Sequence, residues 1–249
     1  MKIASFITAR LKSQRLKRKV LLPICGRPMI SHLVDRLKLS KKCEKIVLCT
    51  STVEQDDDLE AFAAKEGIDC FRGHPDDVML RLRDAATYYN VDIISSCTAD
   101  NPLIDNVSMD HLIEYHIKGK FDFSISQNLP FGTFTMAVNK DSLNKACAIK
   151  DSDETEFWPQ YFLRTNQFKL GNLFHKNIYS DQSIRLTVDE ELDFKLINNI
   201  FTNLYKNKKV FSLEQVLSYL NQNPELKAIN SSVNQKKPNS IKIKKELAA

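Results

Sequence analysis

The sequence has no long apolar run and no amino-terminal stretch that resembles a secretion signal. A helix needs about 20 consecutive apolar residues to cross a bilayer, and no part of the chain comes close to that length. Residues 1–4 lead directly into a predicted strand, without the apolar segment that signal peptides carry. We therefore expect a cytoplasmic protein that has no membrane partner.

The cysteines and histidines also lack the spacing of a metal site or a disulfide framework. No cysteine belongs to a C-x-x-C pair, and the six are Cys25, Cys43, Cys49, Cys70, Cys97 and Cys147. The five histidines show no ligand spacing either. Zinc sites and disulfide-rich folds depend on such patterns, so we expect reduced, buried thiols and no zinc.

The net charge of +5 is modest, and the basic residues are concentrated in residues 10–19 and near the end of the chain. A nucleic-acid-binding domain usually spreads lysine and arginine over one face and places aromatic side chains between them. No such interleaving is present, so we expect no nucleic-acid partner. The 249 residues and 43% hydrophobic content are sufficient for one sizeable α/β domain.

The first thirty residues organise the rest of the chain. Residues 2–9 predict a buried strand, residues 10–19 are basic and contain no acid, and residues 30–39 carry apolar side chains at helical spacing. A basic loop between a first strand and a helix is a common way to hold a phosphate chain. We predict phosphate binding here; the alternative is a solvated surface loop.

Strands and helices alternate through the first hundred residues. Strands are predicted at 2–9, 45–50, 68–71 and 91–98, and helices at 30–39, 53–66 and 77–89. This alternation predicts an α/β fold, a three-layer sandwich with a mostly parallel central sheet. Ligands bind such sheets at the carboxyl ends of the strands. We therefore expect one crevice to collect the groups that follow strand ends, namely the basic loop, Thr50, Arg72, Gly73 and Asp100.

The second half of the chain is less regular. Strands are predicted at 121–126, 134–138, 168–173 and 183–187, with a small β-hairpin subregion at about residues 120–140. Helices are predicted at 141–148, 154–163, 194–205 and 212–221, the last with Ser212 as its N-cap. We expect one domain over residues 1–230 and a flexible, lysine-rich tail over residues 231–249.

Two aspartates are candidates for binding a metal ion. Asp100 and Asp189 each follow a predicted strand, and Asp193 lies one helical turn after Asp189. Mg²⁺ takes a small number of hard oxygen ligands and completes its shell with water and substrate phosphates. Carboxylates beside a phosphate-binding loop therefore suit Mg²⁺. The alternatives are that Asp100 is a turn residue and that Asp189 is the N-cap of the next helix.

The basic loop and the residues after it resemble the nucleotide-binding signature of the sugar cytidylyltransferases. The similarity is to the CMP-Kdo synthetase group and especially to the SpsF-like branch of spore coat polysaccharide biosynthesis. The family patterns are A-R-x-x-S-x-R-L-x-x-K-x-L and G-[KR]-P-[ML]-I. The matching residues are Ala9, Arg10, Ser13, Arg15, Leu16, Lys19, Leu21, Gly26, Pro28 and Ile30.

Further motifs resemble the family in the same order along the chain. They are F-R-G-x-x-x-D-V at residues 71–78, D-x-P-L-I-D at 100–105, R-L-T-V-D-x-x-x-D at 185–193 and N-P-E-L at 223–226. The resemblance thus extends from residue 3 to about residue 230. Independent motifs in one order rarely coincide, so we identify the chain as similar to this family.

The resemblance implies a glycosyltransferase-A-like nucleotide-binding fold that uses CTP and Mg²⁺. The triphosphate would be held by Ala9, Arg10, Ser13, Arg15 and Lys19, the metal by Asp100 and Asp189, and the base or ribose would lie near Thr50, Arg72 and Gly73. Arg10, Arg15, Lys19 and Asp100 would be the catalytic residues. In-line attack on the α-phosphorus puts charge on the oxygen that bridges to pyrophosphate, and fixed cations stabilise that charge without a covalent nucleophile.

Three places depart from the family pattern. Lys17 and Arg18 stand where the family has Pro-Gly, Ala99 stands for a glycine, and residues 131–136 read F-G-T-F-T-M instead of D-G-L-D-x-E. Two acids are therefore missing from what would be the acceptor side. A less acidic, more aromatic segment could suit an anionic acceptor or a contact with a partner subunit; the alternative is neutral change in a hairpin.

The sequence therefore predicts an enzyme that transfers CMP from CTP to an acidic sugar of the Kdo or nonulosonate type. Pyrophosphate would be released, and the product would serve surface glycan biosynthesis. The alternatives are activation of a phosphonate or a sugar phosphate, and a nucleotide-binding homologue without turnover. The expected partners are CTP and a small anionic acceptor, and the resemblance implies a homodimer.

Overall fold

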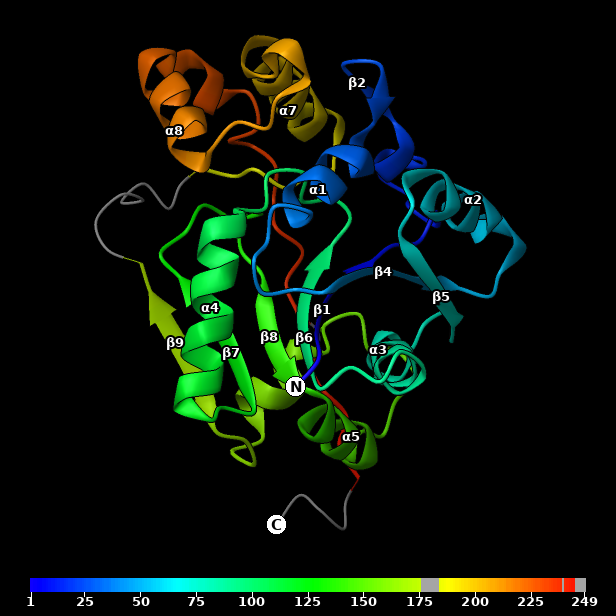
Figure 1. Ribbon diagram of the computed structural model, residues 1–249. Helices are drawn as coiled ribbons and strands as arrows, with labels where there is room; N and C mark the ends of the chain where they lie inside the picture. The colour runs from blue at the N-terminus through cyan, green and yellow to red at the C-terminus, as the bar shows by residue number, and fades with distance from the viewer. Residues whose placement is uncertain (176–183, 239, 245–249) are drawn as a thin grey trace.

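A central sheet with helices on both faces forms the body of the protein (Figure 1). The computed structural model describes residues 1–175, 184–238 and 240–244. In these residues the main sheet has seven strands, and β8 alone runs against the others. The strands are β1 (Ile3–Thr8), β4 (Lys45–Ser51), β5 (Asp69–Gly73), β6 (Ile93–Thr98), β7 (Phe123–Gln127), β8 (Met136–Asn139) and β9 (Leu170–Phe174).

The strand order places the carboxyl ends of β1 and β6 side by side at the centre of the sheet. The order is β5-β4-β1-β6-β8-β7-β9, and β1 pairs in parallel with both β4 and β6. The chain leaves β1 toward β4 and β5 and then returns to the other side of β1 with β6. Such a reversal opens a crevice at the strand ends, which is where ligands bind sheets of this type.

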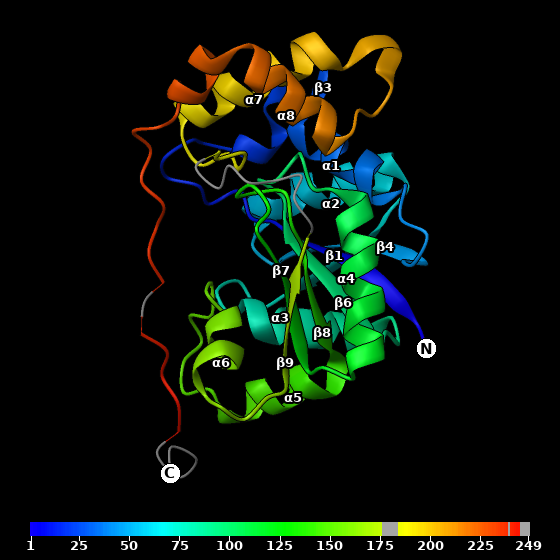
Figure 2. The same ribbon diagram turned by 90° about the vertical axis from the view of Figure 1, so that its left-hand side faces the viewer.

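Helices cover the two faces of the sheet with two separate apolar cores. Side chains of β1 alternate between the cores: Ile3 and Ile7 belong to the first, and Ala4 and Phe6 to the second. Figure 2 shows α4 on one side of the sheet and α3 and α6 on the other. The helices are α1 (Met29–Leu37), α2 (Asp57–Glu66), α3 (Val78–Tyr88), α4 (Asn106–Gly119), α5 (Lys140–Ile149), α6 (Pro159–Arg164), α7 (Glu191–Leu204) and α8 (Leu213–Gln222).

The predicted three-layer α/β sandwich with a mostly parallel sheet is confirmed. The predicted N-cap at Ser212 is also confirmed. Gly67 ends α2 in the left-handed conformation, and Ser212 caps α8 within a capping box. The predicted pairing of two strands near residues 120–140 is present as the antiparallel pair β7–β8, which is part of the main sheet.

Short elements complete the description. A small hairpin of β2 (Pro23–Ile24) and β3 (Arg27–Pro28) turns at Cys25 and Gly26, which both have positive φ. Two successive positive φ values are typical of a type I′ turn. The single-turn helices are η1 (Lys19–Leu21), η2 (Glu54–Asp56), η3 (Lys206–Lys208) and η4 (Pro224–Ala228).

Several predicted elements in the second half are shorter than expected. The helix predicted at 154–163 begins only at Pro159, because proline suits the first helical position and disfavours helix before it. The strand predicted at 134–138 begins at Met136. Residue 183 of the strand predicted at 183–187 lies outside the described residues, and residues 184–187 form only one bridge, between Arg185 and Phe131.

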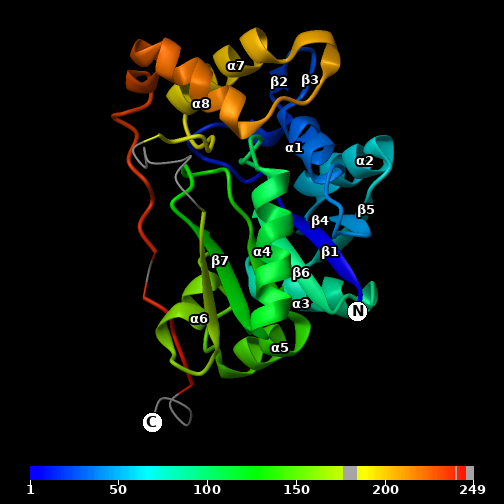
Figure 3. The ribbon, with the colours of Figure 1, turned by 60° about the vertical axis from the view of Figure 1, so that its left-hand side comes forward.

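The described part of the carboxyl-terminal segment, residues 231–238 and 240–244, lies along one side of the molecule. It runs from η4 at one end to α5 at the other, past α6 (Figures 2 and 3). Near its end, Asp151 N donates to Lys242 O at 2.9 Å and Lys244 N donates to Ile149 O at 3.0 Å. The boundary at residue 230 and the flexibility of the segment stay predictions; the described residues nevertheless make specific backbone contacts with the domain.

Two expectations from composition can be compared with the described residues. No helix among them combines the length and the apolar character needed to cross a membrane. All six cysteines are free, as expected. The prediction that they are buried is correct for Cys49, Cys97 and Cys147 but wrong for Cys25, because this residue occupies the exposed turn between β2 and β3.

Candidate active site

A cavity of about 1190 Å³ opens where the carboxyl ends of β1 and β6 meet. The loop after β1 lines one part of it, and residues after β6 lie beside that loop. Residues between α5 and α6 and residues of the carboxyl-terminal segment line the rest. The structure thus brings together segments from both halves of the chain, as expected for a crevice at a switch in strand order.

The predicted loop residues all line this cavity: they are Ala9, Arg10, Ser13, Arg15 and Lys19. Arg10 is held in place by the loop after β5, because its Nη1 donates to Pro75 O at 2.6 Å and to Asp76 Oδ1 at 2.8 Å. The buried Arg81 also lines the cavity and donates to the neighbouring His74 O at 2.5 Å. The two arginines therefore fix the rim beside the basic loop.

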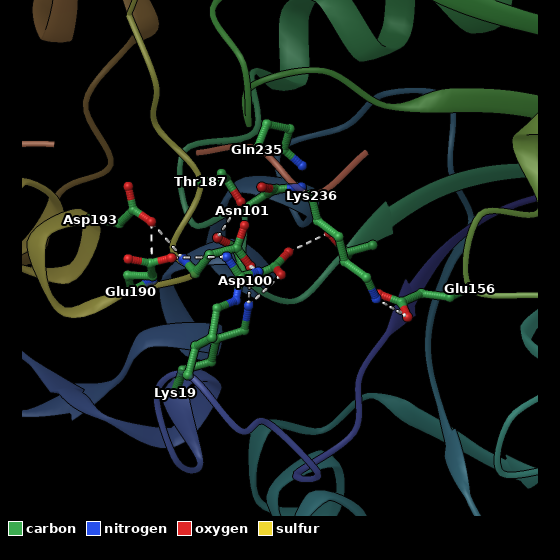
Figure 4. A network of polar contacts seen from close by, with 12 residues as sticks. Lys19, Asp100, Asn101, Glu156, Thr187, Glu190, Asp193, Gln235 and Lys236 are labelled. Carbon is green, nitrogen blue, oxygen red and sulfur yellow. Dashed lines mark hydrogen bonds and ion pairs between the residues drawn. The ribbon is translucent and has the colours of Figure 1, made fainter. Parts of the chain in front are cut away.

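Lys19 joins the two predicted aspartates. Its Nζ lies 2.7 Å from Asp100 Oδ2 and 2.8 Å from Asp189 Oδ1, and all three residues line the cavity. Arg15 adds a second cation, with Nη2 at 3.0 Å from Asp189 Oδ1. Figure 4 shows Lys19 reaching up to Asp100 at the centre of this network. A site that attracts a cation therefore exists between two carboxylates that are 89 residues apart in the sequence.

Backbone hydrogen bonds bring the two aspartates together. Asp100 lies two residues after the end of β6, and its carbonyl accepts from Val188 N at 2.9 Å. Two positions earlier, Leu186 N donates to Phe131 O at 2.7 Å. Residues 184–188 are therefore fixed as an extended segment beside the strand ends, which places Asp189 next to Asp100.

The structure also decides between a helix cap and a site residue at Asp189. The N-cap of α7 is Glu190, and Asp193 completes the capping box, so the alternative that Asp189 is the N-cap is wrong. Asp193 accepts from Asp189 N at 2.9 Å and is fully buried, while Arg185 Nε lies 3.0 Å from its Oδ1. Asp193 therefore orients the segment that carries Asp189 and does not line the cavity.

Electrostatic interactions stabilise the charged forms of this cluster. Burial alone would raise the pKa of Asp189, but Lys19, Arg185 and Arg15 outweigh it, and the pKa lies below its ordinary value. Burial would likewise lower the pKa of Lys19, yet Asp100 and Asp189 raise it. These opposite shifts favour the charged forms of both groups, so the ammonium of Lys19 lies beside the ionised carboxylate of Asp189.

The residues present fit a magnesium ion only together with a phosphate-bearing ligand. Within the described residues, no group of three or more His, Cys, Asp or Glu side chains could hold a metal ion. Asp100 and Asp189 supply two carboxylates, and Mg²⁺ commonly binds one or two carboxylates plus substrate phosphates and water. The Lys19 ammonium now occupies the place between them, so it would have to move for a metal to bind.

Three predicted nucleotide-binding residues do not reach the cavity: Thr50, Arg72 and Gly73. Thr50 is fully buried in β4. The Arg72 guanidinium instead pairs with two acids of α2, Asp57 at 2.6 Å and Glu60 at 2.8 Å. The structure therefore gives no support to contacts of these residues with a base or ribose.

The departures from the family pattern also have defined places. Residues 131–136 do not line the large cavity; Phe131 instead lies under the guanidinium of Arg185, 5.6 Å from its Cζ to the ring centre. Arg18 has a positive φ of 52° and pairs with Asp58 at 2.6 Å. Ala99 is buried beside Asp100. The aromatic segment thus supports the strip that carries Asp189.

Sequence reasoning missed several groups that shape the cavity. Arg185 belongs to the R-L-T-V-D motif, but its pairing with Asp189 could not be inferred from the four-residue spacing, because that spacing predicts contact on a helix and this segment is extended. Nothing in the sequence, apart from their aromatic character, indicated that Phe157, Trp158 and Tyr161 line the cavity as an aromatic wall. The contribution of residues 234–242 could not be foreseen, because it depends on where the carboxyl-terminal segment lies.

Comparison with known proteins gives a consistent result. The family model described as "Cytidylyltransferase" matches residues 4–229. An uncharacterized protein of Methanocaldococcus jannaschii is 34% identical over 95% of this chain and 97% of its own length. The spore coat polysaccharide biosynthesis protein SpsF of Bacillus subtilis is 28% identical over 90% of this chain and 95% of its own.

Two further comparisons concern named cytidylyltransferases. An 8-amino-3,8-dideoxy-manno-octulosonate cytidylyltransferase of Shewanella amazonensis is 30% identical over 51% of this chain and 52% of its own length. A solved structure of a cytidylyltransferase from Leptospira borgpetersenii superposes with a TM-score of 0.84 and 27% identity, over 96% of this chain and all of that one.

Proposed function

The chain belongs to the cytidylyltransferase family, and from this premise we propose that it transfers CMP from CTP to an acidic sugar and releases pyrophosphate. The observation that carries the proposal is the position of Lys19. Its ammonium joins the basic loop after β1 to Asp100 and Asp189 at the wall of one large cavity. A triphosphate and its counter-cation would meet at this point.

The basic loop supplies the charges for the triphosphate. Arg15 and Lys19 are both paired with Asp189, so they can exchange that carboxylate for phosphate oxygens without crossing the cavity. Arg10 stays fixed against the loop after β5. Charge-assisted hydrogen bonds to phosphate are strong and directional, and arginine matches the geometry of two phosphate oxygens.

Magnesium is part of the proposal. Asp100 and Asp189 would hold the ion, which would neutralise charge on the triphosphate oxygens when bound. The protein's own groups then complete the reaction. Lys19, released from the carboxylates, would stabilise the charge that grows on the oxygen leaving with pyrophosphate, and the acceptor oxygen would attack the α-phosphorus in line.

The proposed acceptor class depends on relatives. The Shewanella amazonensis protein is named for a sugar acid, and the Bacillus subtilis protein for polysaccharide biosynthesis. The cavity has cationic groups at both ends, including Lys236 and Lys242 beyond the basic loop. An acceptor that carries a carboxylate is therefore electrostatically suited to it.

The test is a nucleotide and acceptor matrix. Pyrophosphate release is measured with each of the four nucleoside triphosphates, against a panel of sugar acids, sugar phosphates and phosphonates. We expect release with CTP and a sugar acid, with the label of α-labelled CTP recovered in the sugar product. Transfer to a phosphonate but not to a sugar acid would show that the acceptor is a phosphonate and that the proposed acceptor class is wrong. No release with any pair, despite CTP binding, would favour a homologue without turnover.

A further inference from the structure

The large cavity has more room than a single ligand needs. Its volume of about 1190 Å³ exceeds the roughly 300–1,000 Å³ that is usual for small-molecule pockets. The basic loop and the two aspartates occupy only one part of the lining. The remaining lining contains aromatic rings together with amide, carboxylate and ammonium groups, a mixture that suits a polyhydroxylated ligand.

The carboxyl-terminal segment forms one wall of this second part. Asn234, Gln235, Lys236, Ser240, Ile241 and Lys242 all line the cavity. The facing wall comes from the residues between α5 and α6 and includes Glu156, Phe157 and Trp158. Figures 2 and 3 show the segment passing α6 on its way to α5, so the placement is clear from two directions.

The segment is anchored beyond the cavity, and within the cavity wall it makes an ion pair that a ligand can displace. Beyond the cavity, Ile243 bridges Lys150 and packs with Ile241 against the second core. Within the cavity wall, Lys236 Nζ lies 2.7 Å from Glu156 Oε2, and the two side chains are about half exposed. The same ammonium lies 5.2 Å from the ring centre of Phe157. An exposed ion pair of this kind contributes little to stability and exchanges readily for another anion.

A chain of contacts links this segment to the proposed reaction centre. Gln235 Oε1 accepts a hydrogen bond from Arg185 Nη1, and Arg185 Nη2 lies 2.7 Å from Asp189 Oδ2. Gln235 and Lys236 are adjacent, so the group that meets Glu156 is one residue from the group that meets Arg185. Figure 4 shows Lys236 extending to Glu156 while Lys19 reaches Asp100.

We propose that residues 234–236 and 240–242 form the wall of the acceptor subsite, and that Lys236 binds the carboxylate of a sugar acid after leaving Glu156. The inference rests on the proposed function and adds the place and the contact of the acceptor. Phe157, whose ring is partly exposed, supplies an apolar surface on which a sugar ring can lie, and Gln235 supplies an amide for its hydroxyls.

The protein carries its own probe for this subsite. Trp158 is the only tryptophan of the chain, it is buried, and it lines the cavity. Its fluorescence is followed while 2-keto-3-deoxy-manno-octonic acid is titrated in EDTA, with CTP present or absent. The methyl ester of the acid serves as the matched ligand, because it keeps the sugar and lacks the negative charge.

Two variants of one ion pair separate binding from a merely structural role. Lys236→Ala should weaken binding of the acid by roughly tenfold or more, because a charge-assisted contact is lost, and should leave binding of the ester unchanged. Glu156→Gln should strengthen binding of the acid, because it removes the competing carboxylate. Lys237→Ala, an exposed neighbour outside the cavity lining, is the control and should match the wild type.

Weaker acid binding by Lys236→Ala together with stronger acid binding by Glu156→Gln supports the inference. Equally weakened acid binding in both variants would mean that the ion pair only holds the cavity wall in place, and would overturn the inference. A chain ending at Val233 should lose acid binding and keep CTP binding; a chain ending at Lys244 should keep both. If the wild type binds CTP but no acid probe, the subsite assignment fails and nucleotidyl transfer to another acceptor stands. If CTP itself does not bind, the proposed function fails first.

Discussion

At the scale of single residues, the position of Lys19 is the most informative feature. Its ammonium stands 2.7 Å and 2.8 Å from two carboxylates, which is where a divalent cation would be expected between them. The free protein thus satisfies the acids with a side chain, and a phosphate chain would draw that side chain away. Metal binding and triphosphate binding should therefore depend on each other.

Replacing Lys19 with methionine tests this dependence. The variant leaves Asp100 and Asp189 without the ammonium between them, so it should bind Mn²⁺ in the absence of nucleotide roughly tenfold more tightly than the wild type. Electron paramagnetic resonance of free Mn²⁺ measures the difference. Lys17→Met, an exposed change in the same loop, is the control. Equal Mn²⁺ binding by all three proteins would show that Lys19 does not compete with a metal.

The sequence predicted the residues of this cluster but not all of its neighbours. Arg15 and Lys19 follow a buried strand in a loop without acids, so their convergence on Asp100 and Asp189 could be foreseen, whereas Arg10 of the same loop pairs with Asp76. Arg72 is the last but one residue of β5, at the same edge of the sheet, yet its guanidinium pairs with Asp57. The end of a strand determines the backbone position of a basic residue, whereas the direction of its charged group depends on which acidic side chain is nearest in space.

At the scale of elements, residues 184–188 form the link between the two halves of the site. The sequence predicts a strand at residues 183–187, but the described residues 184–188 form only one bridge, from Arg185 to Phe131, and a backbone hydrogen bond from Val188 N to Asp100 O. Its neighbour Gly132 has a φ of 96°, and a Cβ there would lie 2.5 Å from Thr187 N. Close backbone approach therefore requires glycine at this position.

Gly132→Ala should accordingly destabilise the protein and disturb the site. We expect a loss of about 2–3 kcal/mol in the free energy of unfolding, from the backbone clash and the positive φ, with a larger loss of activity. Gly67→Ala is the matched control, since Gly67 has a φ of 66° with open space around its Cβ position. It should cost only about 1 kcal/mol. Urea unfolding of both variants measures the difference. Equal decreases in the free energy of unfolding would show that the close backbone contact between Gly132 and Thr187 does not matter.

The elements of the first half could be predicted because their signals are local. Alternating apolar strands, helical periodicity and a glycine cap lie within a few residues of one another, and the structure reproduces them from β1 to β6. The docking of residues 184–188 and 234–244 depends on hydrogen bonds to partners far away in the sequence, such as Val188 N to Asp100 O. Neither periodicity nor composition encodes such partners.

At the scale of the whole molecule, two cores and one sheet hold the cavity walls in register. The sheet carries the basic loop and Asp100, the first core anchors α7 behind Asp189, and the second core carries the aromatic wall and the end of the carboxyl-terminal segment. Because the same cores hold the cavity walls, changes that lower the global stability should also disturb the site. The homodimer stays a prediction.

The stability of the whole molecule should fall in mild acid. Burial lowers the pKa of His32, His116 and His175 in the folded state below the ordinary value of 6.5. Below about pH 6.5 the unfolded chain then binds protons that the folded chain does not, so stability is full above this pH and is lost as pH falls toward the folded pKa values. Urea unfolding at about pH 7.5 and about pH 5.5 measures the loss.

A variant assigns part of this pH dependence. His116 contacts Ser124 and Asn139 from within the core, so His116→Gln can keep polar contacts without titrating. The variant should show a smaller difference in unfolding free energy between the two pH values than the wild type. If the variant and the wild type lose the same unfolding free energy between the two pH values, His116 does not contribute to the pH dependence. If the wild type becomes more stable in acid, the predicted direction of the pH dependence is wrong.

The most direct test of the account is the magnesium dependence of CTP binding, measured by titration calorimetry with and without Mg²⁺. In the wild type, Mg²⁺ should strengthen CTP binding by roughly tenfold or more, because Asp100 and Asp189 become metal ligands as Lys19 moves to the phosphates. Asp100→Asn should lose this dependence, while the exposed control Asp141→Asn should retain it. The same dependence in Asp100→Asn as in the wild type would contradict a metal-bound triphosphate between the basic loop and the two aspartates.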